Sequence, residues 1–153
     1  MMKLVIGVIS DTHGLVRPEV VSTFRDCQLI IHAGDIGSPD VMERLKEMAP
    51  VVAVRGNMDK GEWAGKYPLT ETVTAENKNI YILHELSKLD LVPQIAGFDA
   101  IISGHTHKPL VERREGVLFL NPGSAGPKRF NLPVCLALIE IENNLINTRV
   151  VEI

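Results

Sequence analysis

The sequence contains only two cysteines among its 153 residues, and no apolar run approaches the length of a membrane span. A transmembrane helix needs roughly 20 consecutive apolar residues, so we expect no membrane partner. Cys27 and Cys135 lie beside or within apolar runs and match neither a metal-binding pair nor a disulfide framework. We expect buried free thiols in a cytoplasmic protein. The first residues, MMKLVIGVISD, lack a small-residue cleavage site behind the apolar run, which argues against a signal peptide.

Positive charge is also scarce. The formal net charge is −3, so the composition does not favour non-specific binding of nucleic acid, and we expect no such partner. Hydrophobic residues make up 45% of the chain, which is enough to build a core. The length suits one domain, which we predict to span residues 1–153.

The chain up to residue 57 alternates between apolar runs of strand length and helical patterns. Continuous apolar runs of this kind are typical of strands that are covered on both faces. Ser38 and Pro39 suit the start of the second helix. The alternation predicts parallel strands joined by right-handed crossovers. The expected elements are strands at 3–10, 27–35 and 50–57 and helices at 18–26 and 38–48.

The rest of the chain is rich in strands. The turn signals ENKN, EG and ENN separate several of them and are typical of hairpins. A short helix around LVPQIA, stopped by Gly97, interrupts this half. We predict an α/β protein whose parallel half and hairpin-rich half pack as two sheets. The expected strands are 69–75, 79–85, 99–103, 110–115, 117–121, 134–141 and 145–153.

Polar residues that can bind metal follow the ends of several of these strands. Ligand sites in open α/β sheets lie beyond the carboxyl ends of the strands, so these side chains are expected to converge. The candidate metal ligands are Asp11, His13, Asp35, Asn57, His84, His105 and His107.

Four of these candidates form two pairs, Asp11 with His13 and His105 with His107, spaced two residues apart. On extended chain this spacing puts both side chains on one face, and glycines beside four of the candidates let the backbone turn tightly. Mixed nitrogen and oxygen ligands suit manganese, iron, nickel or zinc better than calcium. Seven ligands are too many for one tetrahedral ion, so we predict two ions that share a carboxylate.

The fragments DTH, GD, GNMD, a histidine at 84 and GHTH occur in an order that resembles the calcineurin-like metallophosphoesterases. The chain is most similar to their small single-domain YfcE/MJ0936-type phosphodiesterase branch. The resemblance covers nearly the whole chain, including NPGS at 121–124. It implies a four-layer α-β-β-α sandwich of two mixed sheets. It also implies hydrolysis of a small phosphate ester, with a diester favoured, by hydroxide that two divalent metal ions activate.

The resemblance also implies roles within the site. Manganese is the favoured ion, with nickel, iron, zinc or magnesium as alternatives. Asp35 would bridge the two ions and share the catalytic role with Asn57, which would also donate a hydrogen bond to the phosphate. The implied ligands are Asp11, His13, Asp35 and His107 for one ion and Asp35, Asn57, His84 and His105 for the other.

Two residues depart from the family pattern. Many relatives carry a histidine where Met58 stands, and that residue is associated with protonating the leaving group. Methionine has no proton to give, so we expect a preference for esters whose leaving groups depart as anions. A histidine introduced at position 58 is expected to be oriented by Asp59. Glu85 stands where a glycine often follows the ligand histidine, and it adds bulk and negative charge beside the substrate path.

The motif NPGS has two interpretations. It is either a turn between strands or a phosphate cradle in which Asn121, Gly123 and Ser124 bind the substrate. His32 lies inside a predicted strand and outside the family motif, so we interpret it as structural.

Two other functions stay open. The small subunit of the eukaryotic retromer coat resembles this fold and is mainly a protein-binding scaffold. A phosphomonoesterase would share the metals but normally keeps the histidine missing at position 58. The complete ligand set favours an enzyme, because gathering imidazoles and carboxylates without a metal is electrostatically unfavourable. Homo-oligomerisation stays open, as does the role of Trp63 and Tyr67 as a substrate wall or a subunit contact.

Overall fold

The computed structural model describes residues 3–153 and contains two five-stranded sheets. The strands of the first sheet are β1 (Leu4–Ile9), β2 (Leu29–His32), β3 (Val51–Ala53), β9 (Cys135–Glu142) and β10 (Leu145–Glu152). They lie in the order β10-β9-β1-β2-β3. The parallel strands β1, β2 and β3 are joined through the helices α1 (Pro18–Phe24) and α2 (Pro39–Lys46), which confirms the predicted alternation. The antiparallel pairing of β9 with β1 makes the sheet mixed.

The second sheet is also mixed. Its strands are β4 (Thr70–Ala75), β5 (Lys78–Leu83), β6 (Ala100–Ile102), β7 (Leu110–Arg114) and β8 (Val117–Asn121), in the order β4-β5-β6-β8-β7. The strands β5, β6 and β8 are parallel, while β4 and β7 pair antiparallel with their neighbours. The connections include the short helix α3 (Pro93–Ala96) and the 3-10 turns η1 (Ala64–Lys66) and η2 (Leu86–Lys88).

The two sheets pack face to face over a core cluster that joins side chains such as Ile6 and Ile31 to Ile80 and Ile102. Alternate strand residues point away from this interface. In the first sheet they pack against α1 and α2, and in the second they pack under η2 and the loops around α3. Both faces of the central strands are therefore covered, which accounts for their continuous apolar sequence.

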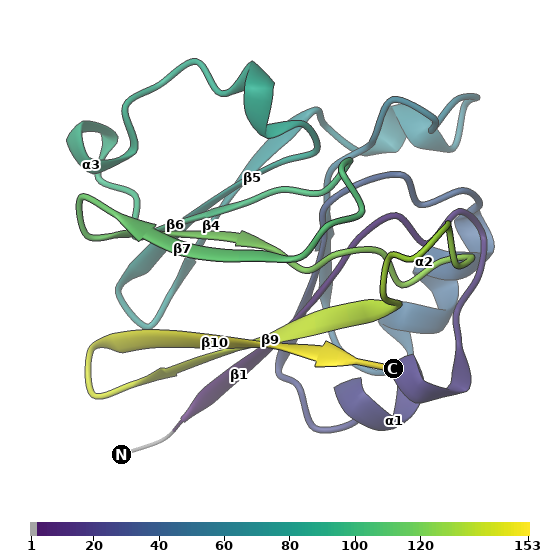
Figure 1. The fold of residues 1–153 in the computed structure, drawn as a ribbon, viewed down its shortest axis with the longest axis horizontal. Coiled ribbons are helices and arrows are strands. Elements are labelled where there is room, and N and C mark those ends of the chain that lie inside the picture. Colours follow the sequence, from purple (N-terminus) through teal and green to yellow (C-terminus); the bar gives the residue numbers. More distant parts are fainter. Residues whose placement is uncertain (1–2) are drawn as a thin grey trace.

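Figure 1 shows α1 and α2 together on one side of the molecule and α3 at the opposite end. The expected four-layer arrangement of two mixed sheets between helices is confirmed. The fourth layer is thin, because α3 has only four residues before Gly97 ends it in the left-handed region, as predicted.

Three predicted hairpin turns are also confirmed, between β4 and β5, β7 and β8, and β9 and β10. Both central residues have positive φ in each turn, as type I′ hairpin turns require. These residues are Glu76 and Asn77, Glu115 and Gly116, and Asn143 and Asn144.

Several predicted boundaries are too wide. The strand expected at 50–57 ends at Ala53, because the chain then turns toward β4 and Arg55 donates its backbone N–H to the carbonyl of Pro68. Helix α2 does begin after Ser38, but the serine side chain makes no capping hydrogen bond.

The two cysteines and the aromatic residues Trp63 and Tyr67 lie in the core or pack against it. Cys27 and Cys135 are buried free thiols, as expected, and burial raises the pKa of each to about 11. Trp63 and Tyr67 are half-buried and pack against the core cluster beneath α1 and α2. Among residues 3–153, the structure has no helix that is long and apolar enough to span a membrane.

Candidate metal centre

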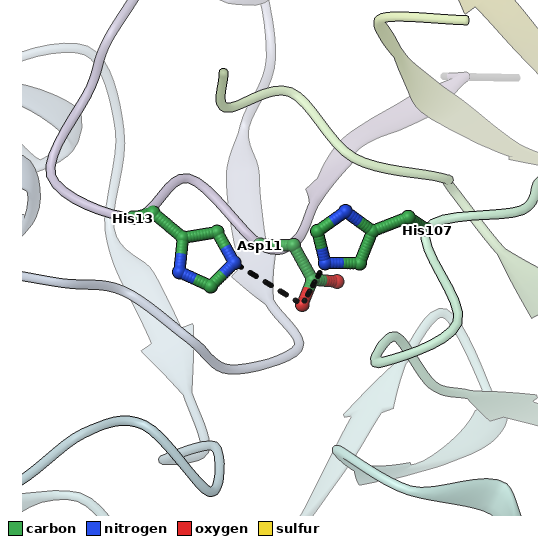
Figure 2. Close-up of side chains that lie close together, drawn as sticks. All are labelled: Asp11, His13 and His107. Carbon is green, nitrogen blue, oxygen red and sulfur yellow. Dashed lines mark ion pairs between the residues drawn. The ribbon is translucent and has the colours of Figure 1, made fainter. Parts of the chain in front are cut away.

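The predicted ligands follow the carboxyl ends of five strands, and the structure brings most of them together at one edge of the two sheets. Asp11 and His13 follow β1, Asp35 follows β2, and His84 follows β5. Figure 2 shows His13 and His107 on either side of the Asp11 carboxylate, although His107 comes from the loop after β6. Convergence at the strand ends is therefore observed for residues that are far apart in the sequence.

The backbone at these positions is not extended, contrary to the expectation for the two pairs. Five of the seven candidate ligands have positive φ, although none is glycine: Asp11 (55°), His13 (46°), Asp35 (57°), His105 (72°) and His107 (63°). Such conformations are unfavourable for residues with a Cβ and persist only where the surrounding structure enforces them. In the loops after β1 and β2, hydrogen bonds between the two loops enforce them, because the N–H groups of Asp11 and His13 donate to the carbonyls of Gly34 and Asp35.

Close packing of these loops explains why glycines lie beside the ligands. A Cβ atom built on Gly56 would lie 2.1 Å from Asp35 Oδ1, and one on Gly104 would lie 2.0 Å from Ser10 Oγ. No other residue type fits at either position without moving the ligand loops.

One oxygen of the Asp11 carboxylate accepts hydrogen bonds, and the other has no hydrogen-bond partner within residues 3–153. Oδ2 accepts hydrogen bonds from Ser10 Oγ at 2.7 Å and from the His105 backbone N–H at 3.1 Å. Oδ1 is buried without a hydrogen-bond partner among residues 3–153. It lies 3.4 Å from His107 Nε2, 3.8 Å from His84 Nε2 and 3.9 Å from His13 Nε2.

Asp35 has the same division between its two oxygens. Oδ1 accepts the Met58 backbone N–H at 2.9 Å, whereas Oδ2 lies 3.3 Å from His84 Nε2 and 3.9 Å from His13 Nε2. Burial alone would raise the pKa of Asp35, but the close approach of the His84 ring and the hydrogen bond from the Met58 N–H outweigh it and hold the pKa at about 2. The carboxylate is therefore charged over the whole physiological range.

The four candidate histidines lie in two pairs. The rings of His13 and His107 stack with their centroids 5.5 Å apart, and those of His84 and His105 meet edge to face at 5.2 Å. His105 and His107 thus lie on different sides of the centre despite their closeness in sequence. The division of the two histidines between two ions stays a prediction.

His84 is oriented by the first sheet. Its Nδ1 donates to the carbonyl of Ala33 at 2.7 Å, which turns Nε2 toward the two carboxylates. A backbone carbonyl on the outer nitrogen is the arrangement that orients metal-binding histidines. Burial opposes a charge on His84, but the nearby carboxylates of Asp35 and Asp11 outweigh it and raise the pKa of His84.

The donor atoms have the chemistry that a divalent cation requires. Five buried side-chain atoms have no hydrogen-bond partner within residues 3–153. Four of them belong to candidate ligands, namely Asp11 Oδ1, His13 Nε2, His84 Nε2 and His107 Nδ1, and the fifth is Arg17 Nε. His107 faces Asp11 with its other ring nitrogen, Nε2. Buried polar atoms are rarely left unpaired, because removing them from water costs free energy that nothing then offsets. Two compact groups form among these residues: Asp11, His13 and His107, and Asp11, Asp35 and His84. The residues present fit divalent metal ions.

The geometry offers Asp11 as a second candidate for the bridging ligand, beside the predicted Asp35. Asp35 Oδ2 approaches one histidine of each pair, as a bridging ligand should. Asp11 Oδ1 does the same and belongs to both compact groups. Asn57 and His105 are solvent-exposed, and His105 belongs to neither group, so the role of both residues as ligands stays a prediction.

Asp59 has a structural role that the sequence interpretation missed. Its buried carboxylate accepts the N–H groups of Gly56, Ile36 and Gly37 at 2.8, 3.1 and 3.0 Å. Because both oxygens are engaged, the expectation that Asp59 would orient an imidazole at position 58 is wrong. Asp59 instead ties the loop after β3 to the loop after β2. An aspartate two residues after Asn57 gave no distinctive signal for this role.

For NPGS the structure favours the turn. Asn121 Nδ2 donates to the carbonyl of Gly104 at 2.9 Å, and its Oδ1 accepts the N–H of Gly123 at 2.9 Å. Ser124 Oγ donates to the Asp11 carbonyl at 3.1 Å. These buried groups brace the loops that carry Asp11 and His105, and they are not turned toward a ligand.

His32 is structural, as predicted. Its Nδ1 accepts the Gly34 N–H at 3.0 Å, so the proton of the neutral ring lies on Nε2, which is 3.0 Å from Thr12 Oγ1. The Thr12 hydroxyl in turn donates to the carbonyl of Ile36 at 2.8 Å. Complete burial lowers the pKa of His32 to about 4, so the ring is neutral at physiological pH.

A pocket of about 260 Å³ opens beside the centre and shares Asn57 and His84 with it. Glu85 also lines this pocket, and its carboxylate lies 3.4 Å from Lys88 Nζ. The negative charge that Glu85 adds beside His84 is thus partly compensated within the pocket.

The chain is similar to known phosphoesterases. The model of the calcineurin-like phosphoesterase superfamily domain matches residues 2–144. A probable metallophosphoesterase of Methanothermobacter thermautotrophicus is 37% identical over 147 residues, which cover 88% of this chain and 85% of the relative. Phosphodiesterase YfcE of Escherichia coli is 28% identical, with 92% of this chain and 88% of that protein covered. The chain belongs to the calcineurin-like phosphoesterase superfamily.

The same fold also occurs in proteins that are not named as phosphoesterases. The structure of Vacuolar Protein Sorting 29 from Cryptosporidium parvum matches 99% of this chain and 98% of its own, with a TM-score of 0.78. The two sequences are 19% identical, so this likeness shows the shared fold alone.

Proposed function

We propose that this chain is a two-metal phosphodiesterase. The observation that carries the proposal is the set of buried, unpaired donor atoms Asp11 Oδ1, His13 Nε2 and His84 Nε2, with His107 Nε2 3.4 Å from Asp11 Oδ1. In a family of phosphoesterases, such donor atoms are suited to bind two divalent cations, which in turn bind a phosphate ester. When bound, the ions lower the pKa of water, neutralise phosphoryl oxygens and align the attack on phosphorus.

The side chains of the protein keep this centre charged and rigid. Asp35 stays ionised down to about pH 2, so it offers an anionic oxygen at every physiological pH. Ala33 holds the His84 ring with Nε2 toward the carboxylates, and the His105 N–H holds Asp11 so that Oδ1 faces the histidines. Donor groups held in advance need no reorganisation during the reaction.

A diester with a good leaving group is the substrate that the rim of the centre suits best. The Met58 side chain is 60% exposed and has no acidic proton. Asp59, the neighbouring carboxyl group, is fully engaged with backbone N–H groups. Because this part of the rim offers no general acid, the leaving group has to depart as an anion.

A protein-binding scaffold is the second candidate. The fold shared with Vacuolar Protein Sorting 29 is the observation in its favour. The unpaired donor atoms weigh against it, because a scaffold has no need for them. A phosphomonoesterase is the third candidate, and Met58 weighs against it.

The proposal is tested by measuring bound metal together with turnover of bis(p-nitrophenyl) phosphate and p-nitrophenyl phosphate. Purified protein is loaded in turn with manganese, nickel, iron, zinc and magnesium. We expect about two ions per chain and faster turnover of the diester. Asp26→Asn, in an exposed loop remote from the centre, is the matched control for Asp35→Asn. Full activity after exhaustive chelation contradicts the two-metal mechanism, and a faster monoester favours the phosphomonoesterase.

A further inference from the structure

The pocket beside the centre has two kinds of wall. Asn57 and His84 form the side that it shares with the candidate ligands. Leu69 and Leu83, from the chain around the start of β4 and the end of β5, contribute apolar surface; Leu69 is exposed and Leu83 is buried. A group that enters here would leave water while its other end stays beside the centre.

The pocket also carries one uncompensated positive charge. Arg55, Glu85 and Lys88 are the charged residues of its wall apart from His84. Glu85 and Lys88 lie 3.4 Å apart and compensate each other. The guanidinium of Arg55 has no hydrogen bond or ion pair with any residue in 3–153, and the Arg55 backbone is held by Pro68. An unpaired guanidinium in a half-buried wall favours an anion, and it recognises carboxylate and phosphate in a planar, bidentate manner.

Resting on the proposed function, we propose that this pocket binds the ester group that stays on the phosphorus, and that Arg55 selects substrates in which this group is anionic. A diester has two organic groups, and the exposed rim at Met58 gives the departing one direct access to solvent. The pocket receives the other. Its volume of about 260 Å³ lies at the small end of ligand sites, which span roughly 300–1,000 Å³, so it suits a single ring.

The chemistry of the walls defines the substrate class. A ring packs on Leu69 and Leu83, and a carboxylate or phosphate on that ring reaches Arg55. The preferred substrate is therefore a diester with a small apolar body and one negative charge beyond the scissile phosphate. A substituent without charge fills the same space but leaves Arg55 unpaired.

The test uses two diesters with the same p-nitrophenyl leaving group. The second ester group is phenyl in one and 4-carboxyphenyl in the other, so the departing group is constant. We expect wild-type kcat/KM to favour the carboxyphenyl diester. Arg55→Met should lower that preference about tenfold, as expected for one charge-assisted hydrogen bond in a partly exposed pocket. Arg25→Met, on an exposed residue after α1, is the matched control and should leave the preference unchanged.

A binding experiment separates this inference from the proposed function. Metal-free protein labelled with ¹⁵N is titrated with methyl 4-carboxyphenyl phosphate, and the amide signals of Thr70 and Leu83 are followed. We expect shifts in wild type and in Arg25→Met, and much smaller shifts in Arg55→Met. If the amide signals shift but no diester is turned over, the result supports ligand binding in the pocket and contradicts the proposed phosphodiesterase function. Turnover whose substrate preference is the same in wild type and Arg55→Met, with both proteins equally stable to urea, overturns the role of Arg55 and leaves the phosphodiesterase intact.

Discussion

The two sheets contribute differently to the centre. Loops of the first sheet supply both carboxylates, Asp11 and Asp35, whereas the second sheet supplies His84, His105 and His107. The first sheet also orients what the second one brings. The Ala33 carbonyl fixes the His84 ring, and Asp11 Oδ2 holds the backbone of His105. The centre therefore forms only where loops of the two sheets are hydrogen-bonded to each other.

Asp35→Asn, in a loop of the first sheet, should have the largest effect on bound metal and on diester turnover. Its Oδ2 approaches a histidine of each pair, so losing its charge weakens both ions, whereas His84→Asn weakens one. We expect diester turnover to fall at least ~100-fold and bound metal to fall toward zero, with a smaller loss in His84→Asn. Metal analysis and kinetics on both variants check this. If Asp11→Asn loses both ions while Asp35→Asn keeps one, Asp11 is the bridge.

Asp59→Ala should weaken the first sheet without touching a candidate ligand. The substitution leaves the buried N–H groups of Gly56, Ile36 and Gly37 without an acceptor. We expect the free energy of unfolding to fall by about 3 kcal/mol. Urea unfolding measures it, with Asp26→Ala as an exposed control. A loss as small as that of the control would mean that water replaces the carboxylate and that the two loops are not tied by Asp59.

His32 and His84 end strands in different sheets and should respond oppositely to pH. The pKa of His32 is lowered to about 4 in the folded state, so below about pH 6.5 only the unfolded chain takes up its proton. Stability is therefore lost as the pH falls from about 6.5 to 4, by about 2 kcal/mol between pH 7.5 and 5.

In the variant His32→Gln, the part of the stability loss at low pH that His32 causes should be absent. Urea unfolding of metal-free wild type and His32→Gln at both pH values gives the difference between their pH dependences. Equal dependences in the two proteins would mean that His32 is not held neutral. The raised pKa of His84 has the opposite sign and is present in both proteins, so it cancels.

Met58→His should have the smallest effect. A well-placed general acid contributes about 10²–10⁴-fold, but the side chain at this position is 60% exposed and Asp59 is not free to orient it. We expect the ratio of monoester to diester turnover to rise less than about tenfold. Met58→Gln, which cannot act as an acid, is the control. An equal ratio in both variants would show that position 58 does not face the leaving group.

Much of the fold could be predicted because its signals are local. Apolar runs, helical spacing and turn residues such as Asn143 and Asn144 reflect short-range preferences, and the strand ends then place Asp11 or His84 at one edge. The backbone conformation of the ligands was not predictable in this way. Positive φ at Asp11 and Asp35 results from hydrogen bonds between loops that are separate in sequence.

The supporting residues were harder to predict than the ligands. Asp59 follows the motif as an ordinary charged loop residue, and only the folded loops reveal three N–H groups around it. For NPGS the sequence permits a turn or a phosphate cradle, because glycine and hydroxyl groups serve both. The partners of Asn121 and Ser124 favour the turn.

The links to Asp11 have a consequence for how the protein acquires its metal. Its carboxylate is bonded to the backbone of a residue 94 positions later, and its carbonyl to a side chain 113 positions later. Contacts of such long range form late in folding, because the intervening chain has to be ordered first. A nascent chain therefore has no formed cation site until nearly all of it has been synthesised. An ion that binds at this centre would therefore be selected after folding, by the free metal concentrations around the finished protein.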